Sequence, residues 1–337
     1  MPSHDAPAGV TFASFAALGL PTGLQVARSA AEMGFDSFWT AETVGQEAFA
    51  SLAAVATTEP RLSLGTGVLA LQLRTPMLAA MGAATLQSLV PERDVLLGVG
   101  ISSPVVVDRW HGAHYGDAPV SQAREYVQLV GELLSGEPVT HDGTHYRCTK
   151  SRLGVRLEGR RPKVILGALN QRMLRAAGEL ADGVLLNYLP ADAVPWCVEQ
   201  VRAGEVVAGR SAGTCTVYAY VHLGVCDRDA ALPAARKDLF SYAVVPAYAR
   251  AFERAGFADE VAGVRAAHAA GDRVAAVAAI SDRMVDAIDI CGDAATVRAA
   301  MGRYRDAGVD VPVVMALPWG PDRRAVIDAT LAATAGY

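Results

Sequence analysis

The stretch from residue 163 to residue 190 constrains the fold of this chain most strongly. It reads KVILGALNQRMLRAAGELADGVLLNYLP and contains a strand, a loop, a helix and a second strand. The apolar runs at 164–166 and 184–186 have the form of strands buried on both faces, as in parallel sheets. Between them, apolar residues recur at helical spacing: Met173, Leu174, Ala177 and Leu180.

The loop of this unit has the chemistry of an anion site. Gly167 and Ala168 remove side-chain bulk where the strand ends, and Asn170 is expected to cap the following helix. Free N–H groups at a helix N-terminus and the helix dipole both favour an anion. The alternative is ordinary packing of a helix on a strand, because many such units bind nothing.

The same alternation of strand and helix runs through the whole chain. Strands are predicted at 10–15, 36–40, 62–68, 94–99, 164–166, 184–186, 214–225 and 311–317. Helices are predicted at 22–33, 48–58, 76–89, 121–134, 191–208 and 323–335, besides the one at 171–180. Eight strands, each followed by a helix, favour an α/β fold of the (β/α)8 barrel type, a TIM barrel; an open doubly wound sheet is the runner-up.

Two insertions are expected in this barrel. Residues 136–161, which include THDGTHYRC, predict a small hairpin before the fifth strand. Residues 227–271, 274–290 and 296–307 are predicted to be helical and separate the seventh strand from the eighth. The sequence shows no internal repeat or low-complexity linker, so residues 1–337 are expected to form a single domain.

Composition excludes several classes of protein. Of 337 residues, 52% are apolar and 19% charged, which supports a large core. The net charge of -5 comes from interspersed charges, so no nucleic-acid partner is expected. The longest apolar window, 62–73, is too short for a membrane span, and the N-terminal residues lack a signal peptide. The five scattered cysteines indicate reduced thiols and a cytoplasmic location.

Small residues gather where the third, fourth and fifth predicted strands end. In a barrel, the active site forms at this end of the strands. A flat ligand across the mouth needs such backbone access, and a phosphate group would suit the helix that follows the fifth strand. No HExxH, Cys/His cluster or GxSxG is present, so neither a metal nor a serine nucleophile is expected.

Six segments carry a resemblance to a known family. They are MGFDSFWTAE, LSLGTGVLALQLRTP, LLGVGISSPVVVDRWHG, REYVQLVGELLSGEPVTHDGTHY, VILGALNQRMLRAAGELADGVLLNYL and AMGRYRDAGVDVPVV. They resemble, in order and along the whole chain, the luciferase-like monooxygenase superfamily, in particular its coenzyme F420-dependent oxidoreductases. The resemblance implies a TIM barrel with an insertion between strands seven and eight. It also implies a deazaflavin or FMN at the barrel mouth, and a homodimer.

The resemblance also implies where a cofactor would bind. A non-prolyl cis peptide is expected between Gly67 and Val68, and Val68 would support the middle ring. The residues implied to contact the cofactor are Thr66, Gly67, Val68, Gly100, Ile101, Ser102, Gly167, Ala168, Leu169 and Asn170. The family often has glycine where this chain has Leu169 and Asn170, so we expect rearranged phosphate contacts there.

Two residues are candidates for catalysis, Glu42 and His111. Many relatives that oxidise alcohols place an Asp-His pair where this chain has Glu42 and Thr43. Glu42 is therefore a candidate acid or base, with a structural carboxylate bound to backbone or arginine as the alternative. Histidine is the side-chain type best suited to proton transfer at neutral pH, so His111 is a candidate general acid, with loop packing as the alternative. His222, Tyr242 and Tyr248 are further candidates whose orientation the sequence leaves open.

These observations favour an oxidoreductase that transfers a hydride between coenzyme F420 and a small organic substrate. The first alternative is an FMN-dependent monooxygenase that uses O2, and the second is a non-catalytic flavin-binding homologue. A deazaflavin carries a polyglutamate tail, for which Arg74, Arg172 and Arg175 are candidate partners. No membrane partner is expected.

Overall fold

Eight parallel strands form a closed barrel in the computed structural model, which describes residues 7–336. In spatial order they are β1 (Gly9–Thr11), β2 (Ser37–Thr40), β3 (Ser63–Thr66), β5 (Val95–Gly100), β8 (Lys163–Gly167), β9 (Gly183–Leu186), β10 (Thr216–Val225) and β12 (Val311–Ala316). The barrel closes because β12 pairs with both β10 and β1. The predicted (β/α)8 barrel is confirmed.

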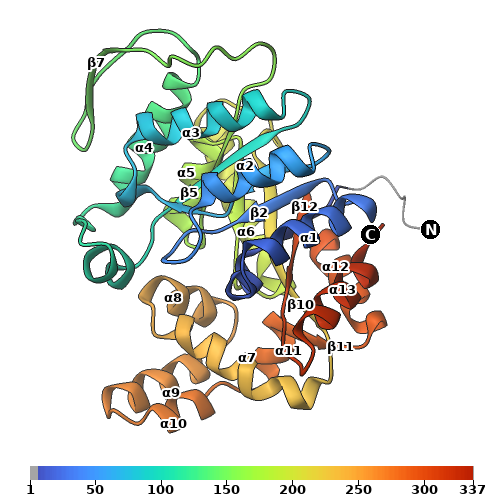
Figure 1. Ribbon diagram of the computed structural model, residues 1–337. Helices are drawn as coiled ribbons and strands as arrows, with labels where there is room; N and C mark the ends of the chain where they lie inside the picture. The colour runs from blue at the N-terminus through green and yellow to red at the C-terminus, as the bar shows by residue number, and fades with distance from the viewer. Residues whose placement is uncertain (1–6, 337) are drawn as a thin grey trace.

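Helices surround the barrel (Figure 1). They are α1 (Leu20–Glu32), α2 (Ala48–Thr58), α3 (Pro76–Leu89), α4 (Pro119–Leu133), α5 (Gln171–Leu180), α6 (Val194–Val207), α12 (Ala294–Asp306) and α13 (Arg323–Thr334). The start of α3 is as predicted, with Pro76 in the first turn and the Thr75 hydroxyl accepting from Leu78 N at 3.3 Å. Within residues 7–336, no helix is both long enough and apolar enough to cross a membrane.

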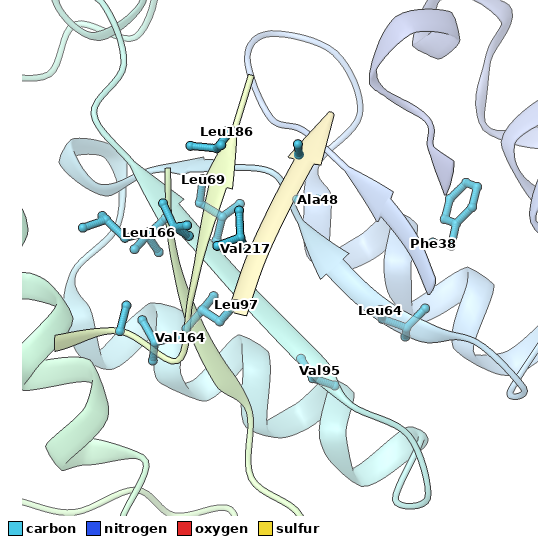
Figure 2. Packing of buried hydrophobic residues seen from close by; sticks show 14 of the residues in the cluster. Phe38, Ala48, Leu64, Leu69, Val95, Leu97, Val164, Leu166, Leu186 and Val217 are labelled. Atoms are coloured by element: carbon cyan, nitrogen blue, oxygen red, sulfur yellow. The ribbon is translucent and has the colours of Figure 1, made fainter. Parts of the chain in front are cut away.

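The core has two layers because side chains alternate along each strand. On β5, Leu96 belongs to the inner cluster while Val95 and Leu97 belong to the outer layer against the helices (Figure 2). The inner cluster fills the barrel with Trp39, Leu96, Ile165, Leu185, Tyr218, Tyr220, Val313 and Met315. A Cβ on Gly65 would lie 2.3 Å from the Trp39 ring, so glycine is required beside this indole.

The predicted hairpin is present as β6 (Val139–Asp142) and β7 (Arg147–Ser151). A single carboxylate of α4 fixes its turn. Glu125 accepts hydrogen bonds from His145 N at 3.0 Å and from Tyr146 N at 2.7 Å, and its Oε1 lies 3.1 Å from His141 Nε2. These bonds hold the pKa of Glu125 below its ordinary value against the effect of burial.

The helical insertion after β10 forms a second apolar cluster of its own. It comprises α7 (Arg228–Ala243), α8 (Pro246–Arg254), α9 (Ala258–Ala269), α10 (Arg273–Ala278) and α11 (Asp282–Ile288). Figure 1 shows these helices together at one end of the molecule, with the β6–β7 hairpin at the opposite end. The predicted continuous segment 227–271 divides into three helices, because Pro246 starts α8 and Gly256, at φ +93°, follows its end.

The predicted helix 274–290 is wrong at its end. It breaks into α10 and α11, and Asp289–Gly292 is a strand, β11. Residues 216–219 of β10 pair with β9, whereas residues 222–225 of β10 pair with β11. Strand β9 ends before β10 does, so the last residues of β10 pair with β11 instead. This tertiary pairing overrides the helical pattern and brings Asp289 opposite His222.

Other boundaries also differ from prediction. The first strand stops at Thr11, and residues Ala13–Leu18 form a 3-10 helix, η1, in which Phe15 packs on Phe12 at 5.2 Å between ring centroids. The third strand ends at Thr66, the bond between Gly67 and Val68 is cis, as the resemblance implied, and β4 (Leu69–Ala70) then pairs with β5. The sixth helix starts as a 3-10 turn, η4 (Ala191–Ala193).

Candidate active site at the barrel mouth

The end of β3 is held from inside the barrel. Tyr220 donates its hydroxyl hydrogen to the Gly67 carbonyl at 3.0 Å and accepts one from the Thr11 hydroxyl at 3.3 Å. Thr66 donates to the Gly98 carbonyl at 2.8 Å. Burial raises the pKa of Tyr220, so its phenol remains a donor at any ordinary pH. The Gly67–Val68 segment is therefore anchored to β1, β5 and β10.

Val68 sits on top of the inner cluster, half-buried, between two glycines. A Cβ on Gly100 would lie 2.8 Å from Val68 Cγ2, and one on Gly167 would lie 3.2 Å from Val68 Cγ1. Ile101 and Ser102 follow Gly100 and are also half-buried. These strand ends form a surface of backbone and small side chains, which we call the glycine shelf (Gly67, Val68, Gly100 and Gly167). A flat ring system fits such a surface.

The predicted cap at Asn170 is wrong. Asn170 is the residue before α5, but its side-chain amide donates to the Ala247 carbonyl of α8 at 3.0 Å instead of capping the helix. Arg254, at the end of α8, donates to the Leu169 carbonyl at 2.6 Å and to Asn170 Oδ1 at 3.2 Å. The insertion therefore binds the Asn170 side chain that was expected to cap α5. The N–H of Met173 bonds the Asn170 carbonyl, so the N–H groups of Gln171 and Arg172 are left for another acceptor, with the exposed Arg254 guanidinium beside them.

Glu42 is engaged in the loop after β2. Its Oε2 accepts from Ala48 N at 3.0 Å and from Arg74 Nη2 at 2.9 Å, and Arg74 also bonds Glu47. These contacts are those of the structural alternative, a carboxylate that joins the start of α2 to an arginine. Arg74, a predicted partner of the cofactor tail, is occupied by the same two carboxylates.

His111 lies at the end of η3 (Val105–Trp110), an exposed single-turn segment after β5. Its Nε2 lies 2.6 Å from the Thr43 carbonyl. A carbonyl only accepts, so Nε2 carries the proton and Nδ1 is left as an acceptor. The structure thus brings the two catalytic candidates onto neighbouring loops, with His111 bridging to the residue that follows Glu42.

A second polar cluster lies at the ends of β9, β10 and β11. His222 places Nδ1 2.9 Å from Asp289 Oδ1 and Nε2 2.8 Å from Asn187 Oδ1. His222 is 1% exposed and Asp289 is 0% exposed. Burial lowers the pKa of His222 to about 4 and raises that of Asp289 well above its ordinary value.

Helix α7 extends this cluster toward the solvent. Tyr188 donates to Asp238 Oδ2 at 2.8 Å, and its ring packs on Tyr242 at 3.7 Å between centroids. Burial and the neighbouring Asp289 raise the pKa of Asp238 to about 6. Tyr248 packs on Tyr242 at 4.8 Å. The orientation that the sequence left open for His222, Tyr242 and Tyr248 is thereby decided: all three face this cluster.

Sequence reasoning missed Asp238 and Asp289. The segment DAIDIC around Asp289 was predicted as helix; the short run 288–291, apolar except for Asp289 and followed by Gly292, was the available signal for a strand. The donor atoms of His222, Asp238 and Asp289 lie within 4.8 Å of one another, as in a metal site. Both ring nitrogens of His222 already take part in hydrogen bonds, so we interpret the group as a hydrogen-bonded network.

A cavity of about 200 Å³ opens beside this network. It is lined by Ala13, Ser14, Tyr188, Asp238, Tyr242, Met315, Leu317, Pro318 and Trp319. Ala13 and Val68 pack on the same inner cluster, to which Met315 belongs, so the cavity and the glycine shelf share the barrel mouth. The barrel mouth therefore combines the flat surface of the glycine shelf, the N-terminus of α5 with N–H groups that can bind an anion, and a small cavity lined by one carboxyl group, that of Asp238.

A barrel with these features belongs to the class of TIM barrels that bind a planar cofactor at the mouth. The sequence profile of the family described as luciferase-like monooxygenase matches residues 10–311. The chain is thus a member of the luciferase-like monooxygenase family.

Individual relatives match along most of their length. Rv3520c of Mycobacterium tuberculosis, whose assignment as a coenzyme F420-dependent oxidoreductase is itself provisional, is 31% identical over 313 residues, covering 87% of this chain and 90% of the relative. The 5,10-methylenetetrahydromethanopterin reductase of Archaeoglobus fulgidus is 29% identical over 306 residues, covering 88% and 89%.

Solved structures show the same fold. The coenzyme F420-dependent tetrahydromethanopterin reductase of Methanopyrus kandleri superimposes with a TM-score of 0.81 at 23% identity, covering 98% of each chain. An F420-dependent secondary alcohol dehydrogenase gives a TM-score of 0.78 at 17% identity, covering 98% of this chain and 99% of that one.

Proposed function

We propose that this protein is a coenzyme F420-dependent oxidoreductase that transfers a hydride between the deazaflavin and a small organic substrate. Two relatives that match along most of their length support this proposal. Rv3520c has a provisional assignment as a coenzyme F420-dependent oxidoreductase, and the relative from Archaeoglobus fulgidus is a 5,10-methylenetetrahydromethanopterin reductase. A bound deazaflavin would supply the hydride chemistry, and the protein would orient the reactants and exclude water.

The observation that carries this proposal is the anion site at the start of α5. The Asn170 side chain is diverted to Ala247, and the Arg254 guanidinium lies against Leu169 and Asn170. Free N–H groups and an adjacent guanidinium suit a phosphodiester in the cofactor side chain. In this proposal the ring lies over Val68 on the glycine shelf, and Thr66, Ile101, Ser102 and Ala168 border it.

A titration of the purified protein with coenzyme F420 and with FMN tests the proposal. We expect the absorbance of F420 to shift on binding, with an affinity above that for FMN. Tighter binding of FMN, together with oxygen consumption by the reduced complex, would instead support the monooxygenase alternative. Binding without turnover of any substrate tested would support the non-catalytic alternative.

A variant of Arg254 tests the anion site separately. Arg254→Gln should weaken F420 binding about tenfold, which corresponds to roughly 1.4 kcal/mol, because one charge-assisted contact is lost. Arg265→Gln is the matched control, since Arg265 is an arginine of the neighbouring helix α9 and bonds Glu253. Equal affinities of the two variants would show that the α5 start binds nothing in this cofactor.

The catalytic candidates keep a place in this proposal. Glu42 would hold the loop after β2 against Arg74, and His111 would close that loop over the ring edge through Thr43. Direct acid or base action by either residue is a second possibility within the same proposal. Glu42→Gln would then lower kcat with little change in thermal stability, whereas a holding role lowers both.

We further propose a single domain, a homodimer and a cytoplasmic location. The insertion contributes Asp238 and Asp289 to the barrel mouth, which supports one domain over residues 1–337. Leu78, Met81 and Leu89 lie on one face of α3 and are between 41% and 47% exposed, which supports a subunit contact. All five cysteines are unpaired, which supports a reducing compartment.

A further inference from the structure

The hydrogen bonds of the network behind the cavity determine which atoms carry its protons. Asn187 Oδ1 accepts from Tyr188 N at 3.0 Å, which fixes the orientation of the amide. The same oxygen lies 2.8 Å from His222 Nε2, so Nε2 must be a donor. His222 Nδ1 and Asp289 Oδ1, 2.9 Å apart, then share one proton.

Asp289 is the residue that holds this shared proton. It is fully buried, and its Oδ2 has no hydrogen-bond partner among residues 7–336. An ionised carboxylate in that position would leave a buried, charged oxygen without a hydrogen-bond donor. The neutral acid that donates to Nδ1 avoids this cost, and it leaves His222 neutral as well.

Asp238 is the member of the network that reaches the cavity. Tyr188 donates to its Oδ2, so Oδ1 is left to carry a proton. Around Asp238, the titratable groups are Tyr188 after β9, His222 on β10, Asp289 on β11, and Tyr242 on α7 itself. Arg236 of α7 pairs with Asp282 of α11 and neutralises neither acid. Asp289 is already neutral, and burial of Asp238 with no paired arginine or lysine among residues 7–336 raises its pKa and favours its acid form as well.

We propose that Asp238 is the acid that delivers a proton to a neutral carbonyl or imine substrate bound in this cavity, and that the buried Asp289–His222 pair positions it through Tyr188, which packs on His222 and donates to Asp238. The inference rests on the proposed function, because it needs a hydride acceptor at the barrel mouth. Asp238 is a catalytic residue in this scheme, and Asp289 and His222 are positioning residues.

The cavity selects the class of substrate. Its walls combine the side chains of Tyr188, Tyr242, Trp319, Met315 and Leu317 with exposed polar surface, and Asp238 is the one carboxyl group in the lining formed by the described residues. A cavity of about 200 Å³ accepts roughly one aromatic ring with a small substituent. A neutral, planar C=O or C=N compound of that size fits both the walls and the acid.

The step balances without a further reagent. The substrate carbon accepts a hydride, the π electrons of the C=X bond move to X, and X takes the proton of Asp238. A bound deazaflavin would supply the hydride and one proton, and the Asp238 carboxylate that remains would be reprotonated. Net transfer is therefore two electrons and two hydrogens to C=X.

The first test uses the protein without cofactor or substrate. Infrared difference spectra between pH 4 and 8, with Asp238→Asn subtracted, isolate the carboxylic acid band of Asp238. We expect this band to disappear with a midpoint near pH 6, and the midpoint to rise by about half a pH unit in Asp289→Asn, since a displaced His222 ring loosens the Tyr188 hydrogen bond that favours the ionised form. Asp229→Asn, an exposed residue of the same helix, should leave the band unchanged.

The assignment is overturned if the carboxylic acid band of the wild type disappears with a midpoint below pH 5. It is also overturned if the midpoint is unchanged in an Asp289→Asn protein that circular dichroism shows to be folded. If Asp289→Asn fails to fold, His222→Gln replaces it. In that variant the Asp238 midpoint must move by at least half a pH unit, because the ring that packs on Tyr188, the hydrogen-bond donor to Asp238, is removed. An unmoved midpoint overturns the positioning role of the pair.

The second test uses acetophenone labelled with ¹³C at the carbonyl as the probe. Bound to the cofactor-free wild type, its C=O stretch should fall in frequency below pH 6 and recover above it, as the Asp238 proton is lost. In Asp238→Asn the frequency should not depend on pH. Absence of binding, or a wild-type frequency that is independent of pH, overturns the proposal. The F420 titration of the same variants is read separately, so loss of F420 binding alone contradicts the proposed function and leaves this result intact.

Discussion

At the scale of single residues, the mouth is fixed by close packing in the barrel interior. Tyr220 lies under Gly67, and Trp39 lies under Gly65, so two glycines of one strand segment face large aromatic rings. Tyr188 adopts φ +52°, a conformation that few side chains tolerate, at the point where its ring joins the Asp238 network. These residues have their roles because of partners that are distant in sequence.

Gly67→Ala should destabilise the protein by about 1–3 kcal/mol, because the added Cβ would lie 1.8 Å from the Tyr220 hydroxyl and force it to move. Urea unfolding followed by fluorescence measures the change. Gly45→Ala is the control, since a Cβ there meets no atom within 4 Å. A Gly67→Ala protein as stable as the control would contradict the packing of Tyr220 on this strand end.

Asp238→Asn should change how stability depends on pH. The folded pKa of Asp238 is raised to about 6 from 3.8, so its contribution to stability is complete below pH 3.8 and is lost as the pH rises through 6. The variant should therefore gain stability relative to the wild type between pH 4 and 7, by roughly 1–3 kcal/mol. Thermal unfolding at several pH values measures this gain, and a constant difference across that range would contradict the raised pKa.

At the scale of elements, short segments are held by single side chains of their neighbours. The hairpin β6–β7 is fixed by Glu125 of α4, and the loop before α5 is fixed by Arg254 of α8. Strand β11 exists because the end of β10 offers it hydrogen bonds beyond β9. Each of these segments depends on a contact made far along the chain.

Glu125→Ala should release the hairpin while the barrel stays folded. The amides of His145 and Tyr146 lose their common acceptor, and an unsatisfied buried donor costs about 1–3 kcal/mol. Hydrogen exchange should show faster exchange at these two amides and unchanged protection in β5 and β8. Glu132→Ala, at a half-buried position of the same helix where the carboxylate accepts from Gln128, serves as the control. Protection that is lost equally across the barrel would mean that Glu125 supports the whole fold.

At the scale of the whole molecule, the barrel gathers residues from eight strands at one mouth, and the insertion covers part of it. The glycine shelf comes from β3, β5 and β8, and the cavity comes from the segments after β1, β9 and β12 together with α7. A cofactor and a substrate would therefore approach from different strands and meet over Val68.

Met81→Lys should disrupt the proposed dimer, because a charge would stand in the apolar face of α3. Light scattering after size-exclusion chromatography should show the wild type at twice the chain mass and the variant at the chain mass. Val274→Lys, at a position 82% exposed on α10, should leave the mass unchanged. A wild type that elutes as a monomer at micromolar concentration would rule out this contact.

The sequence by itself determined the barrel, because apolar runs of strand length alternate with helical stripes and each pattern is local. It also determined the hairpin and the glycine-rich strand ends. Only the tertiary structure decided the direction of the Asn170 side chain, the engagement of Glu42 with Arg74, and the strand at Asp289. Each of these depends on a partner that the fold brings close from a remote part of the chain, and local periodicity carries no signal of such a partner.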